Sequence, residues 1–370
     1  MPLAKATKKH IDKVANSSAT LMLASEEAAR RLTAPVVARA SETLVAKVAV
    51  QLESQQAAMK AAARGIREVQ EQLQHEFAAA MREARSIAQE FAARQVALEA
   101  EPLIAAGRHA LVFAPALPAA EIEAMWAEHA ATSVARRFGS TAIAETMQWQ
   151  RSRKPPAALP RYLGRVQQRL EPERKLHAVT QSVSAYNEAK RDQWNQLREG
   201  RAKTLPGIPG ETEGKRGRGT RHPVDDGFRR IWSAKLDAKT CPVCWGHDGE
   251  IVKVDEPFRE GANTPLHGHC RCDTSVIHIP EELQKYLAGA ELDYDALKDD
   301  IKDYMGSRKF DVGEGVRHAR RFVDEMFEKR YPSREQSPIR GSALVLTQRV
   351  NNRRDYFPNV ARLKAPPLLR

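Results

Sequence analysis

The stretch "IREVQEQLQHEFAAAMREAR" (66–85) decides the fold class of this chain of 370 residues. Ile66, Val69, Leu73 and Phe77 recur at intervals of three and four, which places them on one side of an α-helix. Alanine, glutamine, glutamate and arginine fill most other positions, and these residues favour helices. The pattern predicts a long amphipathic helix that buries one face.

The same composition continues on both sides and predicts helix over residues 20–100, with only Pro35 and Gly65 as breakers. We expect two or more long helices, packed on each other or on a partner. Aromatic residues make up only 6% of the chain, which suits helices more than sheets. The predicted fold class is mainly α, with Pro/Gly-rich linkers.

A further helix is expected over residues 119–149, with Ile122, Met125, Trp126 and Phe138 as buried anchors.

Downstream, residues 151–165 contain three prolines in a basic context and are interpreted as a linker. Residues 172–199 predict a helix with Pro172 in its first turn, where proline is tolerated. Helices are also expected at 281–305 and 313–331.

The formal net charge of +12 is concentrated in two places. Residues 151–221 contain 17 Lys and Arg against 7 Asp and Glu, and residues 331–370 contain 8 against 2. Residues 200–227, which overlap the end of the first region, are rich in Gly, Pro and basic residues and predict a long loop or arm. Solvated loops and contact with a polyanion are the two alternatives. The candidate nucleic-acid contacts are Lys215, Arg216, Arg218 and Arg221.

No apolar run long enough for a secretory signal follows the basic start, and none is expected to span a membrane. The most apolar stretch, residues 102–120, contains Arg108, His109 and three prolines. We therefore expect a protein made in a reducing cytoplasm, where stable disulfides do not form.

All four cysteines lie between residues 237 and 278, in a Cys-x2-Cys pair followed by His-x2-Cys-x-Cys. This spacing predicts a structural zinc site in a small ribbon-like module, flanked by strands at 250–255 and 274–279. Its candidate ligands are Cys241, Cys244, His267, Cys270 and Cys272.

Two ligand sets remain open: the four cysteines, or a set in which His267 replaces Cys270 or Cys272. On an extended strand, the two sulfurs of Cys270 and Cys272 would lie roughly 7 Å apart. His267 and Cys270 can therefore bind one zinc ion together more easily than Cys270 and Cys272 can. His269 is interpreted as a surface histidine.

A closed structural site is the simpler interpretation, because a catalytic zinc keeps an open position. The nearby acids Asp248, Glu250 and Asp255 are interpreted as solvated. The sequence shows no phosphate-binding glycine loop and no catalytic triad, so we expect a protein that is not an enzyme.

The cysteine module has a wider signature: W-x4-D-x2-T-C-x2-C, a gap, and then H-x2-C-R-C. Outside the metal ligands this signature consists of Trp232, Asp237, Thr240 and Arg271. The signature resembles the Mu-F-like head morphogenesis family of phage minor head proteins.

Upstream, residues 178–194 resemble the helix that precedes the module in that family, with Thr180 and Asn187 at matching positions. Gln181 stands where the family usually has an acid, so an ion pair is not expected there. The resemblance extends over residues 175–280.

The resemblance implies a virion protein, a minor capsid protein present in few copies, that acts in viral capsid assembly. It would work in the interior of the virion head near the portal vertex, after assembly in the host cytoplasm. Its implied partners are the portal protein, the major capsid protein or a scaffold protein. Non-specific contact with packaged DNA would suit the basic segments.

Four parts are expected on this basis. They are a long-helix assembly domain (1–150), a head morphogenesis core (151–280), a helical segment (281–331) and a basic tail (332–370). The alternatives are a zinc-ribbon nuclease or other DNA-processing enzyme, and a cytoplasmic DNA-binding regulator. A nuclease needs a hydrated metal held by His and carboxylates, and the chain shows no such set. A regulator needs a recognition-helix motif, which is also missing.

Overall fold

The structure is a computed structural model. The residues that it describes are 5–102, 111–112, 120–198, 203–204, 228–234, 242–254, 256–262, 264, 266, 270, 272–279 and 312–331. Among these residues, no helix is long and apolar enough to cross a membrane.

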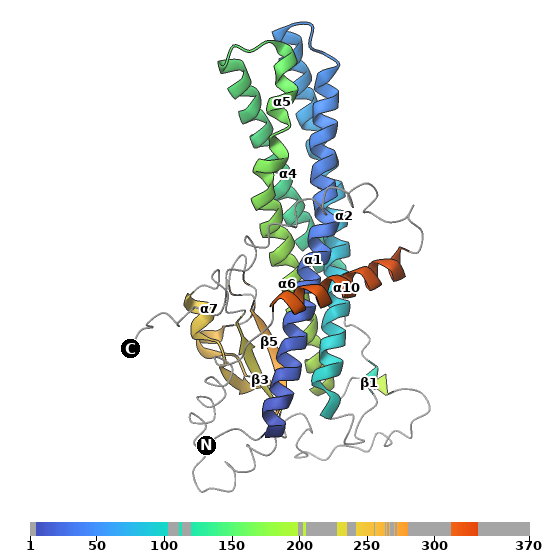
Figure 1. Ribbon diagram of the computed structural model, residues 1–370, viewed down its shortest axis with the longest axis vertical. Coiled ribbons are helices and arrows are strands. Elements are labelled where there is room, and N and C mark those ends of the chain that lie inside the picture. Colours follow the sequence, from blue (N-terminus) through green and yellow to red (C-terminus); the bar gives the residue numbers. More distant parts are fainter. Residues whose placement is uncertain are drawn as a thin grey trace.

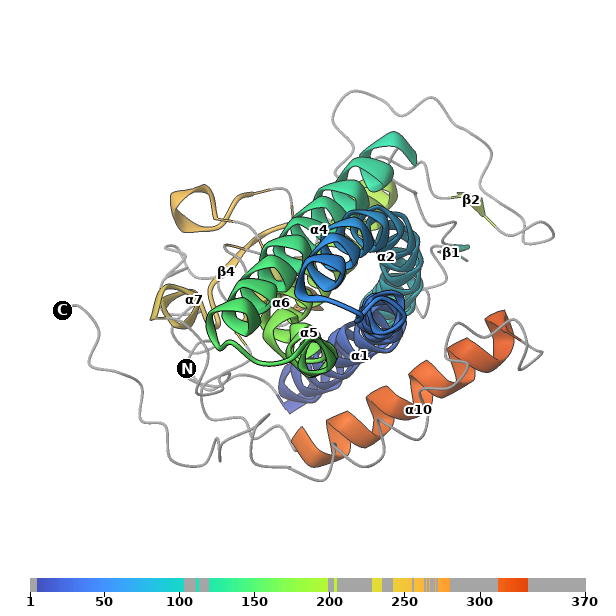
Figure 2. The ribbon, with the colours of Figure 1, turned by 90° about the horizontal axis from the view of Figure 1, so that it is seen from above.

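Four long helices run side by side along the long axis of the molecule (Figure 1). They are α1 (Lys5–Ala49), α2 (Gln55–Glu99), α4 (Ala120–Arg151) and α6 (Val166–Arg198). Seen from above, they form a bundle, and α10 (Val312–Arg330) lies outside it, in contact with α1 and running across the long helices (Figure 2). Because one hydrophobic core contains residues of all five helices, segments far apart in sequence are held together.

The predicted apolar stripe on α2 is confirmed, because Ile66, Val69, Leu73 and Phe77 are all buried in this core. Helix α1 begins earlier than expected and is followed by a short turn. The side chain of Ser54 then caps α2 by accepting a hydrogen bond of 3.1 Å from the backbone N–H of Ala57.

The two expected helix breakers do not break a helix. Pro35 lies inside α1 and is buried, and Gly65 lies inside α2. A Cβ atom at Gly65 would lie 3.2 Å from Cδ1 of Leu44 on α1, closer than an ordinary contact. The glycine therefore allows α1 and α2 to approach closely, which accounts for a residue that helices otherwise disfavour.

Replacement of Gly65 by leucine is expected to lower the free energy of unfolding by about 1–3 kcal/mol, because the added side chain must displace α1. Thermal melting followed by circular dichroism measures the change. Ala63→Leu is the matched control, since residue 63 is exposed on the same helix. An equal effect in both variants would contradict the packing explanation.

The sequence prediction for α4 is correct for the helix and for Phe138, which is buried, but wrong for two of its anchors. Met125 is 58% exposed and Trp126 is 40% exposed. The buried face of α4 instead contains small residues such as Ala127 and Ala131. Alanine allows α4 to lie close to its neighbours, and the larger side chains face outward.

Two further expectations need correction. Helix α6 begins at Val166, so Pro172 lies inside it rather than in its first turn. Residues 151–165 are not simply a linker, because η1 (Pro156–Ala158) and α5 (Leu159–Leu163) form there, and Leu159 and Leu163 are buried. The helix predicted at 313–331 is confirmed by α10. The side chain of Ile122 and the range 281–305 lie outside the described residues.

A three-stranded antiparallel sheet lies beside the lower part of the bundle (Figure 1). Its strand order is β4 (Ile251–Lys253), β3 (Phe228–Ser233) and β5 (Asp273–His278). Both strands predicted from the sequence are present, whereas the central strand β3 was missed. The sequence of β3, FRRIWS, has buried residues on both faces of the strand. Apolar and polar residues do not alternate along it, so the usual signal of a strand is missing.

The sheet is fixed to the bundle by apolar contacts. Ile11 and Val14 of α1 form a buried cluster with Ile231 of β3 and Ile277 of β5. The remaining short elements are β1 (Leu111–Val112), which pairs with β2 (Lys203–Thr204), α7 (Pro242–Gly246) and η3 (Arg259–Gly261). The fold class is confirmed as mainly α with a small module compatible with a zinc ribbon.

Candidate metal centre

Three cysteines converge beside the sheet. Cys244 lies on α7, and Cys270 and Cys272 lie just before β5. Their sulfur atoms are all within 4.8 Å of one another, and all three residues are buried. The distance between Sγ of Cys244 and Sγ of Cys270 is 3.7 Å, so no disulfide joins them. Three buried sulfur ligands at this spacing could hold a metal ion, and a soft or borderline ion is the chemical match.

The pKa shifts of Cys270 and Cys272 also fit a site for a cation. Hydrogen bonds shared with the thiols of Cys244 and Cys272 lower the pKa of Cys270 below its ordinary value. The hydrogen bonds with Cys244 and Cys270 raise the pKa of Cys272 above its ordinary value. Loss of a proton from Cys270 is therefore favoured, and loss of a further proton from Cys272 is opposed, as expected for coupled groups. A cation among the sulfurs would allow all three to ionise.

From the sequence, the sulfurs of Cys270 and Cys272 were expected to lie too far apart to bind one ion easily. This expectation is wrong, because the two sulfurs lie within 4.8 Å of each other. The chain is not in a strand at these two positions, and the strand begins at Asp273. The extended spacing therefore does not apply. Cys241 and His267, either of which could supply a fourth ligand, lie outside the described residues.

Trp232 of β3 forms the apolar wall of the cluster and packs with Phe258 and all three cysteines. Its ring meets Phe258 edge-on, with centroids 5.2 Å apart, and His247 at 4.8 Å. Trp232 stands in the family signature, and the structure gives it this packing role. The other signature residues Asp237, Thr240 and Arg271 lie outside the described part of the chain.

Asp248 and Glu250, which were expected to be solvated, instead form hydrogen bonds within the module. Asp248 is buried, and its Oδ1 accepts a hydrogen bond of 2.8 Å from the backbone N–H of Ala234. Glu250 contacts Nδ1 of His247 at 2.6 Å and accepts a hydrogen bond from the N–H of Arg259 at 2.6 Å. These acids hold the loops around the cysteines. Asp255 and His269 lie outside the described residues.

Helix α6 fixes the strand that leaves the cysteines. The side-chain amide of Asn187 donates to the carbonyl oxygen of Cys272 at 3.2 Å and accepts from the N–H of Thr274 at 3.4 Å. A second donation, to the carbonyl of Val183, orients the amide. Asn187 therefore connects the bundle directly to the backbone of a candidate ligand.

Replacement of Asn187 by alanine is expected to cost about 1–3 kcal/mol, because buried polar groups around Cys272 lose their partner. The melting temperature should fall, and the cysteines should react faster with a thiol reagent. Asn195→Ala, at an exposed position on the same helix, is the control. Unchanged thiol reactivity in Asn187→Ala would show that the connection does not hold the module.

Gln181 lies next to a buried arginine of the bundle. Arg85 of α2 is buried, and its Nη1 donates to Oε1 of Gln181 at 2.8 Å. Nη2 of the same guanidinium pairs with Glu188 at 3.1 Å. Gln181 therefore accepts a hydrogen bond from Arg85, and because its side chain is uncharged the two residues form no ion pair. Thr180 lies half-buried on the same helix.

A buried ion cluster lies behind the cysteines. Nζ of Lys190 is 2.8 Å from Glu99 of α2 and 3.1 Å from Asp273 of β5. Trp194 also donates to Glu99, at 2.7 Å, and Ser18 of α1 donates to Asp273. The cluster therefore joins three helices to the strand that follows Cys272.

The pKa values in this cluster follow from burial and charge. Burial alone would lower the pKa of Lys190, but Asp273 and Glu99 outweigh it and raise that pKa. Burial raises the pKa of Glu99, and Lys190 offsets part of the change. Sequence analysis missed this cluster. The available signal was a lysine three residues after Asn187, on the face of a helix that is otherwise buried.

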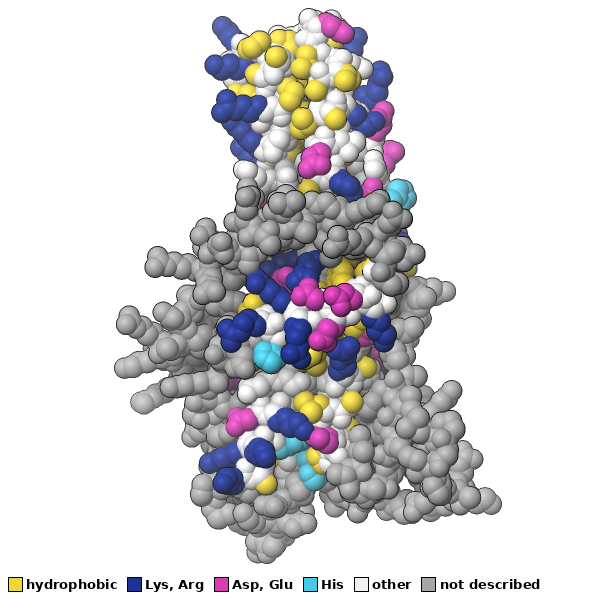
Figure 3. Space-filling view, turned by 45° about the vertical axis from the view of Figure 1, so that its right-hand side comes forward, with side chains coloured by type: hydrophobic (Ala, Val, Ile, Leu, Met, Phe, Trp, Pro, Cys, Tyr) yellow, Lys and Arg dark blue, Asp and Glu magenta, His cyan; other side chains and the backbone are white. Residues whose placement is uncertain are grey.

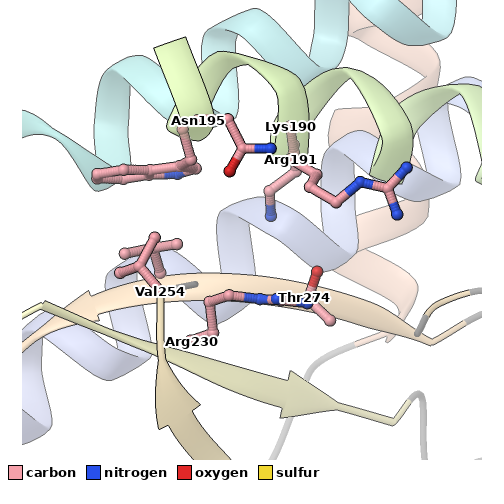
Figure 4. Close-up of a pocket in the computed structure, with 8 residues that line it drawn as sticks. Lys190, Arg191, Asn195, Arg230, Val254 and Thr274 are labelled. Atoms are coloured by element: carbon pink, nitrogen blue, oxygen red, sulfur yellow. The ribbon is translucent and has the colours of Figure 1, made fainter. Parts of the chain in front are cut away.

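A small pocket of about 20 Å³ separates α6 from the sheet. In Figure 4, Lys190 points from α6 towards the strands, and Arg191, Asn195, Arg230, Val254 and Thr274 lie around the same space. Burial, followed by repulsion from Arg191, lowers the pKa of Arg230 to about 10. Among the described residues, the lining contains no carboxylate, imidazole or thiol, so these residues supply no general acid–base pair of those types.

Comparison with known proteins addresses this same segment. Residues 217–275 match the model of the family described as Phage Mu protein F like protein. Neither curated proteins nor solved structures give a significant match. The match begins after α6, so the interpretation of Thr180 and Asn187 stays a prediction. The resemblance to the Mu-F-like head morphogenesis family is confirmed over residues 217–275, the segment that contains the cysteine cluster.

Proposed function

We propose that this chain is a minor head protein of a tailed phage, acting in head assembly without catalysing a reaction. The observation that carries the proposal is the family match over residues 217–275, which includes all three clustered cysteines. Asn187 and Lys190 tie that segment to a long helical bundle. A long helical bundle joined to a small module that could bind a metal ion suits an assembly component more than an enzyme.

The metal proposed is zinc, in a structural role. Cys244, Cys270 and Cys272 would hold it, with Cys241 or His267 as the fourth ligand. Zinc prefers sulfur and nitrogen donors in a closed four-coordinate site. Bound there, it would hold α7 and the chain before β5 together in a module whose apolar core has few members among the described residues.

Low copy number, a position inside the head near the portal vertex, and contact with the portal, major capsid or scaffold protein are part of the same proposal. The family resemblance supports them. Contact with packaged DNA is supported by the basic composition of residues 151–221 and of the tail. The four candidate arginine and lysine contacts in residues 215–221 lie outside the described residues.

A zinc-ribbon nuclease is the second candidate. Incubation of supercoiled plasmid with the purified chain and Mg²⁺, Mn²⁺ or Zn²⁺ separates it from the first. We expect no cleavage above a buffer control. Robust cleavage that is lost in His267→Ala would establish the enzyme instead.

The main test counts this chain in heads purified from infected or induced cells. Quantitative mass spectrometry should give a low number of copies per portal ring, unchanged when external protease is added to intact heads. Co-purification with the portal is expected after the heads are opened. A chain that stays free in the cytoplasm and is absent from heads would contradict the proposal.

A further inference from the structure

The outer face of α4 carries exposed apolar side chains that the bundle does not use. Six large hydrophobic residues are exposed in the described part of the chain, and four of them belong to α4. They are Met125 (58%), Trp126 (40%), Ile143 (48%) and Met147 (52%). Single exposed hydrophobic residues are ordinary, but a concentration on one helix marks an interaction surface.

Helix geometry places most of these side chains along one line. Met125 and Ile143 are 18 residues apart, about five turns, so they lie on the same side of α4 roughly 27 Å apart. Met147 follows Ile143 by four residues and adjoins it on that side. Helix α4 lies on the opposite side of the bundle from α10, so α10 does not cover this line (Figure 2).

Arginines occupy the same face. Arg136 and Arg137 lie between the two apolar pairs, and Arg151 follows Met147 by one turn; all three are exposed. Among the described residues, none of the three forms an ion pair.

The acids of this part of α4 do not neutralise them. Between residues 125 and 151 the acids are Glu128, which pairs with Arg82, and Glu145, whose side chain is fully buried and pairs with Arg169. Between residues 125 and 151, this face therefore combines apolar groups with three positive charges that no described residue pairs with.

The other described faces of the bundle differ. Arg39 of α1 pairs with Glu76 of α2, and Arg31 pairs with Asp324 of α10. Figure 3 shows basic and acidic side chains interleaved over the middle of the face that it presents. Solvated helix surfaces commonly have such mixed charge, whereas the α4 face has one sign together with Met and Trp.

We infer that the outer face of α4 docks a second protein, whose complementary surface is acidic with an apolar centre. Met, Trp and Arg are the residues enriched at protein interfaces. A DNA backbone would satisfy the arginines but offers little apolar surface to Met125, Ile143 and Met147. The inference rests on the proposed function in one respect: the partner is expected among the other proteins of the head.

The first experiment compares the incorporation of variants into heads, by mass spectrometry of purified particles. Ile143→Asp with Met147→Asp, and separately Arg136→Glu with Arg137→Glu, should each reduce the copies per head at least tenfold. Two matched controls should leave the number unchanged: Val50→Asp, at an exposed apolar residue off α4, and Arg64→Glu, at an exposed position on α2.

The second experiment keeps the test valid even if a variant folds poorly. A photo-crosslinking amino acid is placed at Met147, and at Val50 as a control, in otherwise wild-type chain. We expect position 147 alone to crosslink to an Asp/Glu-rich segment of another head protein, less so at high salt. Crosslinks only to a second copy of this chain, or only to DNA, would overturn the inference.

The outcomes separate the two proposals. Wild-type chain that is absent from heads removes the proposed function. Wild-type chain present in heads, with the α4 variants incorporated equally well, overturns the docking surface and leaves the proposed function standing.

Discussion

Removal of bound metal from the full chain is expected to unfold the cysteine module and leave the helical bundle intact. Among the described residues, the apolar cluster around the cysteines has seven buried members, three of which are the cysteines themselves. A core of that size does not stabilise a module alone. A structural zinc contributes on the order of 10 kcal/mol to such modules, so its loss exceeds what the remaining contacts supply.

Hydrogen–deuterium exchange with mass spectrometry measures this directly. After treatment with a strong chelator, amides in residues 242–262 should lose protection. Those in α2 should keep theirs, because the core of the bundle does not include the cysteines. Cys272→Ser should reproduce the chelated pattern without chelator, whereas a calcium-selective chelator should have no effect. Equal protection of residues 242–262 before and after metal removal would contradict a structural metal.

Replacement of Lys190 by methionine is expected to destabilise the chain by about 3–5 kcal/mol, the usual cost of removing one partner of a buried ion pair. Lys190 is the cation that faces both Glu99 and Asp273, and all three side chains are buried. The variant leaves two buried carboxylates without their shared cation, although Trp194 still donates to Glu99 and Ser18 to Asp273. Addition of Glu99→Gln should recover part of the loss, because one of the two charges is then removed.

The pH dependence gives a second readout of the same variant. Burial already raises the pKa of Glu99, and the loss of Lys190 raises it further. A carboxyl group with a raised pKa binds more protons in the folded state than in the unfolded state, so stability rises as pH falls through that range. The difference in melting temperature between wild type and Lys190→Met should therefore shrink as the pH is lowered from neutral towards the raised pKa of Glu99.

Comparison with wild type at each pH removes effects that the two proteins share, such as protonation of the cysteines. Arg191→Met is the matched control, because residue 191 is the next position on α6 and is exposed. It should change the melting temperature little at any pH. A deficit in Lys190→Met that is independent of pH would show that lost packing, not charge, causes the destabilisation.

The sequence predicted the parts of the fold that have a regular apolar period. The stripe from Ile66 to Phe77 and the two strands around the cysteines were identified because spacing alone determines them. Strand β3 was missed because its arginines and aromatic residues share a buried environment that only its two neighbouring strands create.

The errors on α4 have one physical cause. Sequence analysis assigns large apolar residues to the core, and it assigned Met125 and Trp126 there. The structure instead fills that side with alanines, since close approach to α2 requires small side chains. Which side of a helix faces its neighbours depends on tertiary packing, and the sequence around residues 125–126 does not contain that information.

For the candidate site, the clustering of cysteines was predictable from spacing, whereas the attachments were not. Lys190, Glu99 and Asp273 come from three distant segments, and no local pattern relates them. Their contact depends on how α2, α6 and β5 meet.

Elemental analysis of the purified full chain determines whether the cysteine cluster holds a metal ion. We expect one zinc per chain in wild type, and a large loss in Cys244→Ser, Cys270→Ser and Cys272→Ser. Asp12→Asn, a substitution on α1 outside the cluster, should retain the metal. Wild-type chain that is folded and contains no stoichiometric metal would contradict the metal centre, and with it the structural role assigned to the three cysteines.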